Sequence, residues 1–514
     1  MIAGMFAQLG VPTDAPFAVP EVAWSALTPL LILIVGALAL LVVTALVPRT
    51  LPVGFFTVTT VAVAAGAAVA SLGSWDRVTD PDRGPYMAVA GAITLDGFSV
   101  LVTALLAITV VLVALLADGY LRREGLGAAE FSVLVLLSAS GGVMMALAND
   151  LIVMFLGLEV LSIALYVLAG FQGDRRESQE SAMKYFLLGA FASAFLLYGI
   201  ALVYGATGST NLGEIAGFLA RDVPSEQGLL LGGMAMLIVG FGFKIGVVPF
   251  QSWVPDVYQG APTPVTAFMA SGVKVAGFAA LLRVIVSALS VQAQDWRPVM
   301  WVLAMLTLVV GPAMAIVQTD VKRMLAYSSI SHAGFILIGV QAASDRGTAG
   351  ALFYLFAYSF MALGAFGVVS LVARQGDVGV DLDRFRGLSK RRPGLALVFA
   401  VFLLGQTGVP LTSGFMAKFS VIGAAVASES YALAMVAMLT SVVGAFAYLR
   451  VIVAMYLGDD EEMAEEGTRR VQIPAAAGLA LGLALAVTVT LGVLPSTVLD
   501  AARDAVPARL SPSR

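Results

Sequence analysis

The sequence contains no cysteine and a single histidine, His332, among its 514 residues. Without cysteine the chain cannot form disulfides or bind zinc or iron–sulfur clusters through thiolates. One histidine also excludes a histidine-rich metal site. There is no Walker sequence, and the GFGF at 240–243 lies inside an apolar run rather than after a strand. No basic cluster is interleaved with aromatic residues, as nucleic-acid binding would require. Any redox or ATP chemistry that drives this chain must therefore reside in another subunit.

Charged residues are also scarce, at 12% of the chain, whereas 59% of residues are hydrophobic. The mean hydropathy is +0.94. Soluble domains contain about 25% charged and about 45–50% apolar residues. Residues 1–23 hold no Lys or Arg, so they lack the basic region that begins a signal peptide. The composition predicts an integral membrane protein whose first span is retained.

Apolar runs are long enough to cross a bilayer many times, since one spanning helix needs about 20 residues. They predict an all-α polytopic membrane protein with about 14 transmembrane helices and no separate soluble domain. The expected spans are 24–47, 52–72, 96–117, 129–148, 150–170, 181–205, 229–250, 262–289, 299–317, 323–341, 348–373, 394–424, 430–457 and 473–494. Lys and Arg are more frequent in alternate connectors, and the positive-inside rule then places both termini outside.

Two of these spans contain prolines that a continuous helix would not tolerate. One break is expected at 246–255, just after Lys244, and the other at 408–415, just before Lys418. Broken spans in corresponding positions indicate inverted repeats around an ion path. We therefore expect helices 1–3 in 1–128, a first five-helix repeat in 129–289, an inverted second repeat in 290–457, and a last helix and tail in 458–514.

Ionisable residues within the spans are costly, about 2.5–3.5 kcal/mol each at the bilayer centre. Lys244 and Lys274 lie too deep in their apolar runs to reach the interface, and Lys418 follows the second break. Glu159 is a lone carboxylate that needs a cationic partner. Because lysine, unlike arginine, can release its proton when buried, these residues indicate a proton path. A buried pair that only ties helices together is the structural alternative.

Other polar residues of the spans are less decisive. Lys184, early in its span, either joins the path or extends to the interface. His332, flanked by serines, either relays protons between lysines or only packs helices. Arg283 and Arg450 lie near span ends and are expected to anchor helices.

Several segments together are similar to the antiporter-like membrane subunits of respiratory complex I, the NADH–quinone oxidoreductase. They run from about residue 130 to 420, and KYFLLGAFAS and the LGLE around Glu159 most resemble the paralogue designated N. The sequence departs from many relatives at Gln251, where they carry histidine. The segments are LGLEVLSIALYVLAGF (156–171), KYFLLGAFASAFLLYGIALVYGATGS (184–209), FKIGVVPFQSWVPDVYQGAPTPVTAFMASGVKVAGF (243–278), DVKRMLAYSSISHAGF (320–335) and GVPLTSGFMAKF (408–419).

This resemblance implies a bacterial plasma-membrane subunit that moves protons while electrons pass from NADH to quinone elsewhere in the complex. It implies partners in the membrane arm, with FMN, iron–sulfur clusters, NADH and quinone bound by other subunits and no cofactor in this chain. The family's glutamate matches Glu159, and its lysines match Lys244, Lys274 and Lys418. We expect protons to charge Lys274 by way of Lys244, under control of a Glu159–Lys244 salt bridge, and to leave through His332 and Lys418.

Three alternatives have different consequences. A subunit of a multi-subunit cation/proton antiporter would share the fold but would not copurify with flavin and iron–sulfur subunits. A purely structural subunit would tolerate apolar replacement of its buried pairs. A transporter for an organic solute would need a pocket with varied polar groups at the bilayer midplane, whereas the sequence offers mainly a line of lysines.

Overall fold

The computed structural model describes residues 22–47, 51–222, 226–458 and 473–507. Within them, 13 helices are long and apolar enough to cross a membrane. They are α2 (Trp24–Leu46), α3 (Val53–Leu72, continued by α4, Trp75–Thr79), α5 (Gly97–Glu124), α6 (Ala128–Leu147), α7 (Leu151–Ala169), α8 (Arg176–Thr207), α10 (Gln227–Ile245), the composite helix 263–288, α14 (Ala293–Ile316), α15 (Val321–Gln341), α16 (Asp345–Val372), α20 (Tyr431–Leu457) and α21 (Ala475–Val493). The predicted all-α membrane architecture is confirmed.

Both predicted breaks are present. The α10 helix ends at Ile245 and is capped by Gly246, whose φ of +73° is a left-handed conformation that glycine adopts readily. The α11 helix (Trp253–Gly260) follows after seven non-helical residues. The second break divides one predicted span into two shorter helices, α18 (Pro393–Thr407) and α19 (Ser413–Ala427). If α18 and α19 are counted as one broken span, the described residues contain 14 spans, the number that the sequence predicts.

Short elements occupy the connectors. The longest connectors contain a hairpin of β1 (Tyr86–Ala88) and β2 (Ile93–Leu95), the helices α9 (Leu212–Arg221) and α17 (Leu388–Arg391), and the 3₁₀ turns η4 (Gln375–Asp377) and η5 (Leu382–Phe385). A third 3₁₀ turn, η3 (Ser290–Gln292), precedes α14, and α22 (Ser496–Asp504) follows α21. The sequence analysis did not predict α22. The predicted connector 458–472 lies, except for Gly458, outside the described residues.

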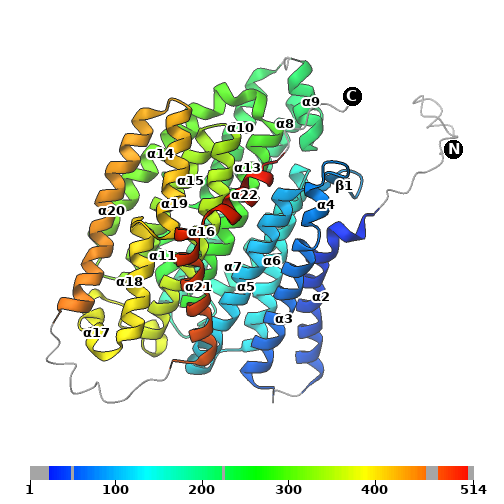
Figure 1. The fold of residues 1–514 in the computed structure, drawn as a ribbon. Coiled ribbons are helices and arrows are strands. Elements are labelled where there is room, and N and C mark those ends of the chain that lie inside the picture. Colours follow the sequence, from blue (N-terminus) through cyan, green and yellow to red (C-terminus); the bar gives the residue numbers. More distant parts are fainter. Residues whose placement is uncertain (1–21, 48–50, 223–225, 459–472, 508–514) are drawn as a thin grey trace.

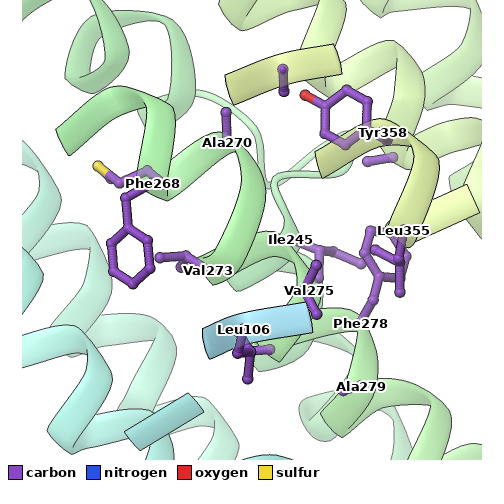
Figure 2. Close-up of a cluster of buried hydrophobic side chains, with 14 of the residues drawn as sticks. Leu106, Ile245, Phe268, Ala270, Val273, Val275, Phe278, Ala279, Leu355 and Tyr358 are labelled. Atoms are coloured by element: carbon purple, nitrogen blue, oxygen red, sulfur yellow. The ribbon is translucent and has the colours of Figure 1, made fainter. Parts of the chain in front are cut away.

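The helices form a bundle in which α2 and α3 stand at one end and α14 and α20 at the other (Figure 1). Its centre holds the composite helix, made of α12 (Thr263–Phe268), the π-helical turn η1 (Met269–Val273), α13 (Lys274–Leu282) and a second π-helical turn, η2 (Arg283–Ala288). Figure 2 shows side chains of this helix, such as Val275, beside Leu106 of α5, Ile245 of α10 and Leu355 of α16. Every residue of α15 except Arg323 is also buried. These two buried helices carry much of the site.

Candidate functional site

Lys244 lies in the last turn of α10, with 4% of its surface exposed. Its ammonium donates hydrogen bonds to the Ser162 hydroxyl of α7 (2.8 Å) and the Tyr185 hydroxyl of α8 (3.1 Å). Residues of these three helices also line a cavity of about 10 Å³ beside the amine. A cavity needs roughly 10–15 Å³ to hold one water. Lys244 is therefore held by neutral hydroxyls.

Glu159 lies one turn before Ser162 on α7, close enough to Lys244 to interact with it electrostatically. Its Oε1 is buried and has no hydrogen-bond partner in the described part of the chain. Among the same residues, Glu159 and Lys244 form no ion pair within 4.0 Å. The two predicted partners are neighbours, but the direct salt bridge is absent from this conformation.

Lys274 begins α13, directly after the π-helical turn η1, and is 3% exposed. A π-turn inserts an extra residue and often marks a functional position. The ammonium donates to the backbone carbonyl oxygen of Ser329 (2.5 Å) and to its side-chain hydroxyl (2.6 Å). The Lys244 side chain packs near Gly277, one turn after Lys274 on α13. The two lysines therefore lie on neighbouring turns of packed helices.

His332 is the next residue along α15 on the face that carries Ser329. Its Nδ1 lies 2.7 Å from the Tyr354 hydroxyl and its Nε2 lies 3.4 Å from the Tyr448 hydroxyl. The Tyr358 ring lies 4.7 Å from the imidazole, and the Lys274 ammonium lies 5.8 Å from the same ring. Both nitrogens of the imidazole are thus within hydrogen-bonding distance of tyrosine hydroxyls, and the ring lies close to Lys274.

Lys418 lies on α19, just after the second break. Its ammonium donates to the Thr407 carbonyl oxygen (2.8 Å) and the Ser441 hydroxyl (2.7 Å). It also lies 4.8 Å from the ring centre of Phe335, one turn beyond His332 on α15. The residues 329, 332 and 335 therefore form one helix face that begins at Lys274 and ends at Lys418. The structure brings together Lys274, His332 and Lys418.

Lys184 does not belong to the series of Lys274, His332 and Lys418. Its side chain is 39% exposed and forms ion pairs with Glu180 and Asp256, each at 2.6 Å. Arg323 binds the other oxygen of Asp256 at 2.7 Å. Burial raises the pKa of Asp256, but hydrogen bonds from Lys184 and Arg323 outweigh this and hold its pKa below the usual value. The side chains of Lys184, Glu180 and Asp256 line an open cavity of about 380 Å³, called here the vestibule, which Asp320 and Asp377 also line.

The two arginines near span ends have structural contacts. Arg283 binds both carboxylate oxygens of Asp96 and the Ala146 carbonyl oxygen. Arg450 donates to the carbonyl oxygens of Ile316, the last residue of α14, and of Gln318, two residues beyond it. Gln251 lies in the first break, and its Oε1 has no hydrogen-bond partner among the described residues.

A buried pair, Lys322 and Asp377, was not predicted from the sequence, because the expected spans place Lys322 in a connector. Both side chains are fully buried and lie 3.2 Å apart. Burial raises the pKa of Asp377, but the Lys322 ammonium and hydrogen bonds from Thr263 and Tyr120 together hold the pKa below its usual range. The available signal was helical spacing, which places Lys322 seven residues before Ser329 on one helix face.

Residues 148–444 match the family described as NADH:quinone oxidoreductase/Mrp antiporter, TM. The NADH-quinone oxidoreductase subunit N of Trichlorobacter lovleyi is 41% identical over 478 residues, which cover 93% of this chain and 96% of that relative. This chain belongs to the subunit N family. The family assigned from the sequence is confirmed.

Solved structures share the fold of this chain. A chain of respiratory complex I from Thermus thermophilus with bound aureothin is 35% identical, with a TM-score of 0.77 over 92% of this chain and 98% of that one. A chain of the Mrp complex from Dietzia sp. has a TM-score of 0.83 over 96% of this chain and 98% of that one, at 22% identity. The second likeness shows a shared fold.

Proposed function

We propose that this chain is the proton-translocating subunit N of a bacterial NADH-quinone oxidoreductase. Electron transfer from NADH to quinone, with its FMN and iron–sulfur clusters, takes place in partner subunits of the same membrane complex. The 41% identity to a subunit N supports this function over a cation/proton antiporter. The observation that carries a proton-moving role is the buried series of Lys274, His332 and Lys418 along one face of α15.

In the proposed route, protons charge Lys274 by way of Lys244 and pass through His332 to Lys418. Two contacts support this route: Lys244 packs one turn from Lys274, and His332 lies between the two residues of α15 that contact Lys274 and Lys418. Buried amines held by hydroxyls and carbonyls can give up a proton without leaving a carboxylate unpaired. The excess of basic residues in alternate connectors supports an orientation with the vestibule facing the cytoplasm and both termini outside.

Glu159 is proposed to control Lys244 by approaching and withdrawing from its ammonium. Its buried, unbonded Oε1 supports this role, because an unpaired buried carboxylate is unfavourable and gains from moving toward a cation. We also propose that 129–289 and 290–457 are two inverted repeats, each with one broken helix.

The experiment compares Lys244→Ala and Glu159→Gln in the assembled complex, with proton uptake into proteoliposomes and NADH oxidation measured together. Assembly is checked first, because leaving one buried charge unpaired can cost about 3–5 kcal/mol. We expect both variants to pump more slowly than an Arg450→Lys control. Undiminished pumping per electron in either assembled variant would contradict the assigned roles. Copurification of flavin and iron–sulfur subunits separates complex I from an antiporter complex.

A further inference from the structure

The pair Lys322–Asp377 lies outside the series of residues assigned to the proton route. Lys322 is in the first turn of α15, where the helix dipole disfavours a positive charge. Its ammonium donates to the Ala261 carbonyl oxygen at 2.6 Å and to Asp377 Oδ2 at 3.2 Å. Burial and the dipole both oppose the charged amine, so its protonated form depends on these two contacts.

Asp377 connects this amine with the vestibule. Its Oδ2 accepts hydrogen bonds from the Tyr120 hydroxyl and the Thr263 amide, both at 3.0 Å. Its Oδ1 accepts no hydrogen bond from the described residues. Asp377 also lines the vestibule, whose other lining residues include the exposed Glu177 and Glu180. One oxygen of this buried carboxylate, beside the open cavity, is therefore without a hydrogen bond.

Two guanidinium groups still balance the negative charge of the Asp377 carboxylate when Lys322 is neutral. Arg123 lies 3.7 Å from Oδ1 and Arg175 lies 3.8 Å from Oδ2. Lys322 can therefore lose its proton without leaving Asp377 as an isolated buried anion, which would be costly. A static pair would be served equally well by arginine, as in the buried pair of Arg283 with Asp96. The Lys322–Asp377 pair therefore differs from the Arg283–Asp96 pair in having a cation that can release a proton.

Polar groups lie at both ends of the stretch between Lys322 and Lys274. Ser329 lies seven residues after Lys322 on α15, which is two turns along one face, and it binds the Lys274 ammonium directly. The Tyr258 side chain interacts with Ser329. Near Asp377, the buried Thr263 hydroxyl has no hydrogen-bond partner among the described residues. Hydroxyls thus flank the space between the two lysines at both ends.

We propose that Lys322 and Asp377 form a proton intake that charges Lys274 from the vestibule without passing through Lys244. This inference rests on the proposed function. The protonated Lys322 gives its proton inward to a neutral Lys274 through the intervening hydroxyls. A proton from vestibule water then reaches the Lys322 amine by way of Asp377, which becomes briefly protonated. The pair returns to ammonium and carboxylate after each cycle, and one proton has moved inward.

The test uses the assembled complex in proteoliposomes. Lys322→Arg keeps the charge but cannot release a proton. Because arginine is bulkier in a fully buried position, the double variant Lys322→Met with Asp377→Asn serves as a second test, since it removes both charges together. The matched control is Arg283→Lys, which changes the cation of the other buried pair. Lys274→Met is measured in parallel, with subunit content determined for every variant.

We expect Lys322→Arg and the double variant, in assembled complex, to translocate protons more slowly than Arg283→Lys, because Lys274 is then charged only by way of Lys244. Parent-like pumping by either assembled variant would overturn the intake, because a purely structural pair tolerates both changes. If Lys274→Met is impaired while these variants pump normally, the intake fails and the proposed function stands. If Lys274→Met also pumps normally, the proposed function itself fails.

Discussion

The ammonium of Lys274 lies 2.6 Å from the hydroxyl of Ser329, three residues before His332 on the same helix. The contact joins Lys274, in the first predicted repeat, to α15, the helix of the second predicted repeat that carries His332. It also places the amine beside the face of α15 that ends at Lys418. The two halves of the proposed route therefore meet at this hydrogen bond.

Ser329→Ala removes the hydroxyl and leaves Lys274 only the carbonyl oxygen of residue 329. A hydrogen bond to a charged group contributes about 1.5–3 kcal/mol, so the ammonium loses stabilisation of this order. We expect proton translocation by the assembled complex to slow by about tenfold, which corresponds to about 1.4 kcal/mol. Ser359→Ala is the control, because Ser359 is equally buried but bonds only the Leu355 carbonyl of its own helix. Equal rates for the two variants would contradict the role of Ser329.

Gly408 allows the second break to form beside Lys418. Its φ is +90°, and a Cβ at this position would lie 3.0 Å from Cδ of Lys418. A left-handed conformation costs a non-glycine residue about 1–2 kcal/mol. Gly408→Ala is therefore expected to lower the thermal stability of the complex and to slow pumping by displacing Lys418.

Gly394→Ala is the matched control for this prediction. Gly394 has ordinary helical φ, and nothing lies within 4 Å of the position that a Cβ would occupy. It is expected to leave both stability and pumping close to the parent. A Gly408→Ala complex as stable and as active as Gly394→Ala would show that the break tolerates a side chain.

Asp377 predicts a definite pH dependence of stability. Its pKa is held below the usual value, against the effect of burial, chiefly by the Lys322 ammonium. The folded state therefore prefers the carboxylate, and the stabilisation is present above the unfolded pKa of about 3.9 and is lost as the pH falls through the lower folded value.

Asp377→Asn is accordingly expected to unfold at a lower temperature than the parent at pH 7, by an amount corresponding to about 3–5 kcal/mol for breaking one buried pair. The difference should shrink as the pH falls below about 4. Thermal denaturation of the detergent-solubilised complex, followed at both pH values, measures it. A difference that stays constant with pH would show that the charge of Asp377 does not stabilise the fold.

The sequence predicted the features that lipid makes expensive. Charges at 244, 274 and 418 and the prolines at both breaks stand out because a bilayer offers them no solvent. Their contacts depend on which helices pack together, which periodicity in uniformly apolar spans does not reveal. For this reason the partners Ser162, Tyr185 and Ser329 were not identified in advance.

Other parts of the site could not be read from spacing along the chain. Asp377 lies in a connector, and its role depends on contacts with α5, α12 and α15. Lys322 looked like an ordinary basic residue at a helix start, because nothing local to the sequence shows that the 374–393 connector covers it. The expected Glu159–Lys244 salt bridge needs a side-chain placement that the sequence does not determine.

The central claim is that Lys274 carries protons, and proton uptake per NADH oxidised by Lys274→Met complex in proteoliposomes tests it most directly. Methionine keeps the length of the side chain and removes the titratable amine, so packing changes little. With full assembly shown, the account predicts that translocation falls by at least about tenfold, as for loss of an essential proton carrier. Proton uptake per NADH and pumping rates equal to the parent in the fully assembled variant would contradict it.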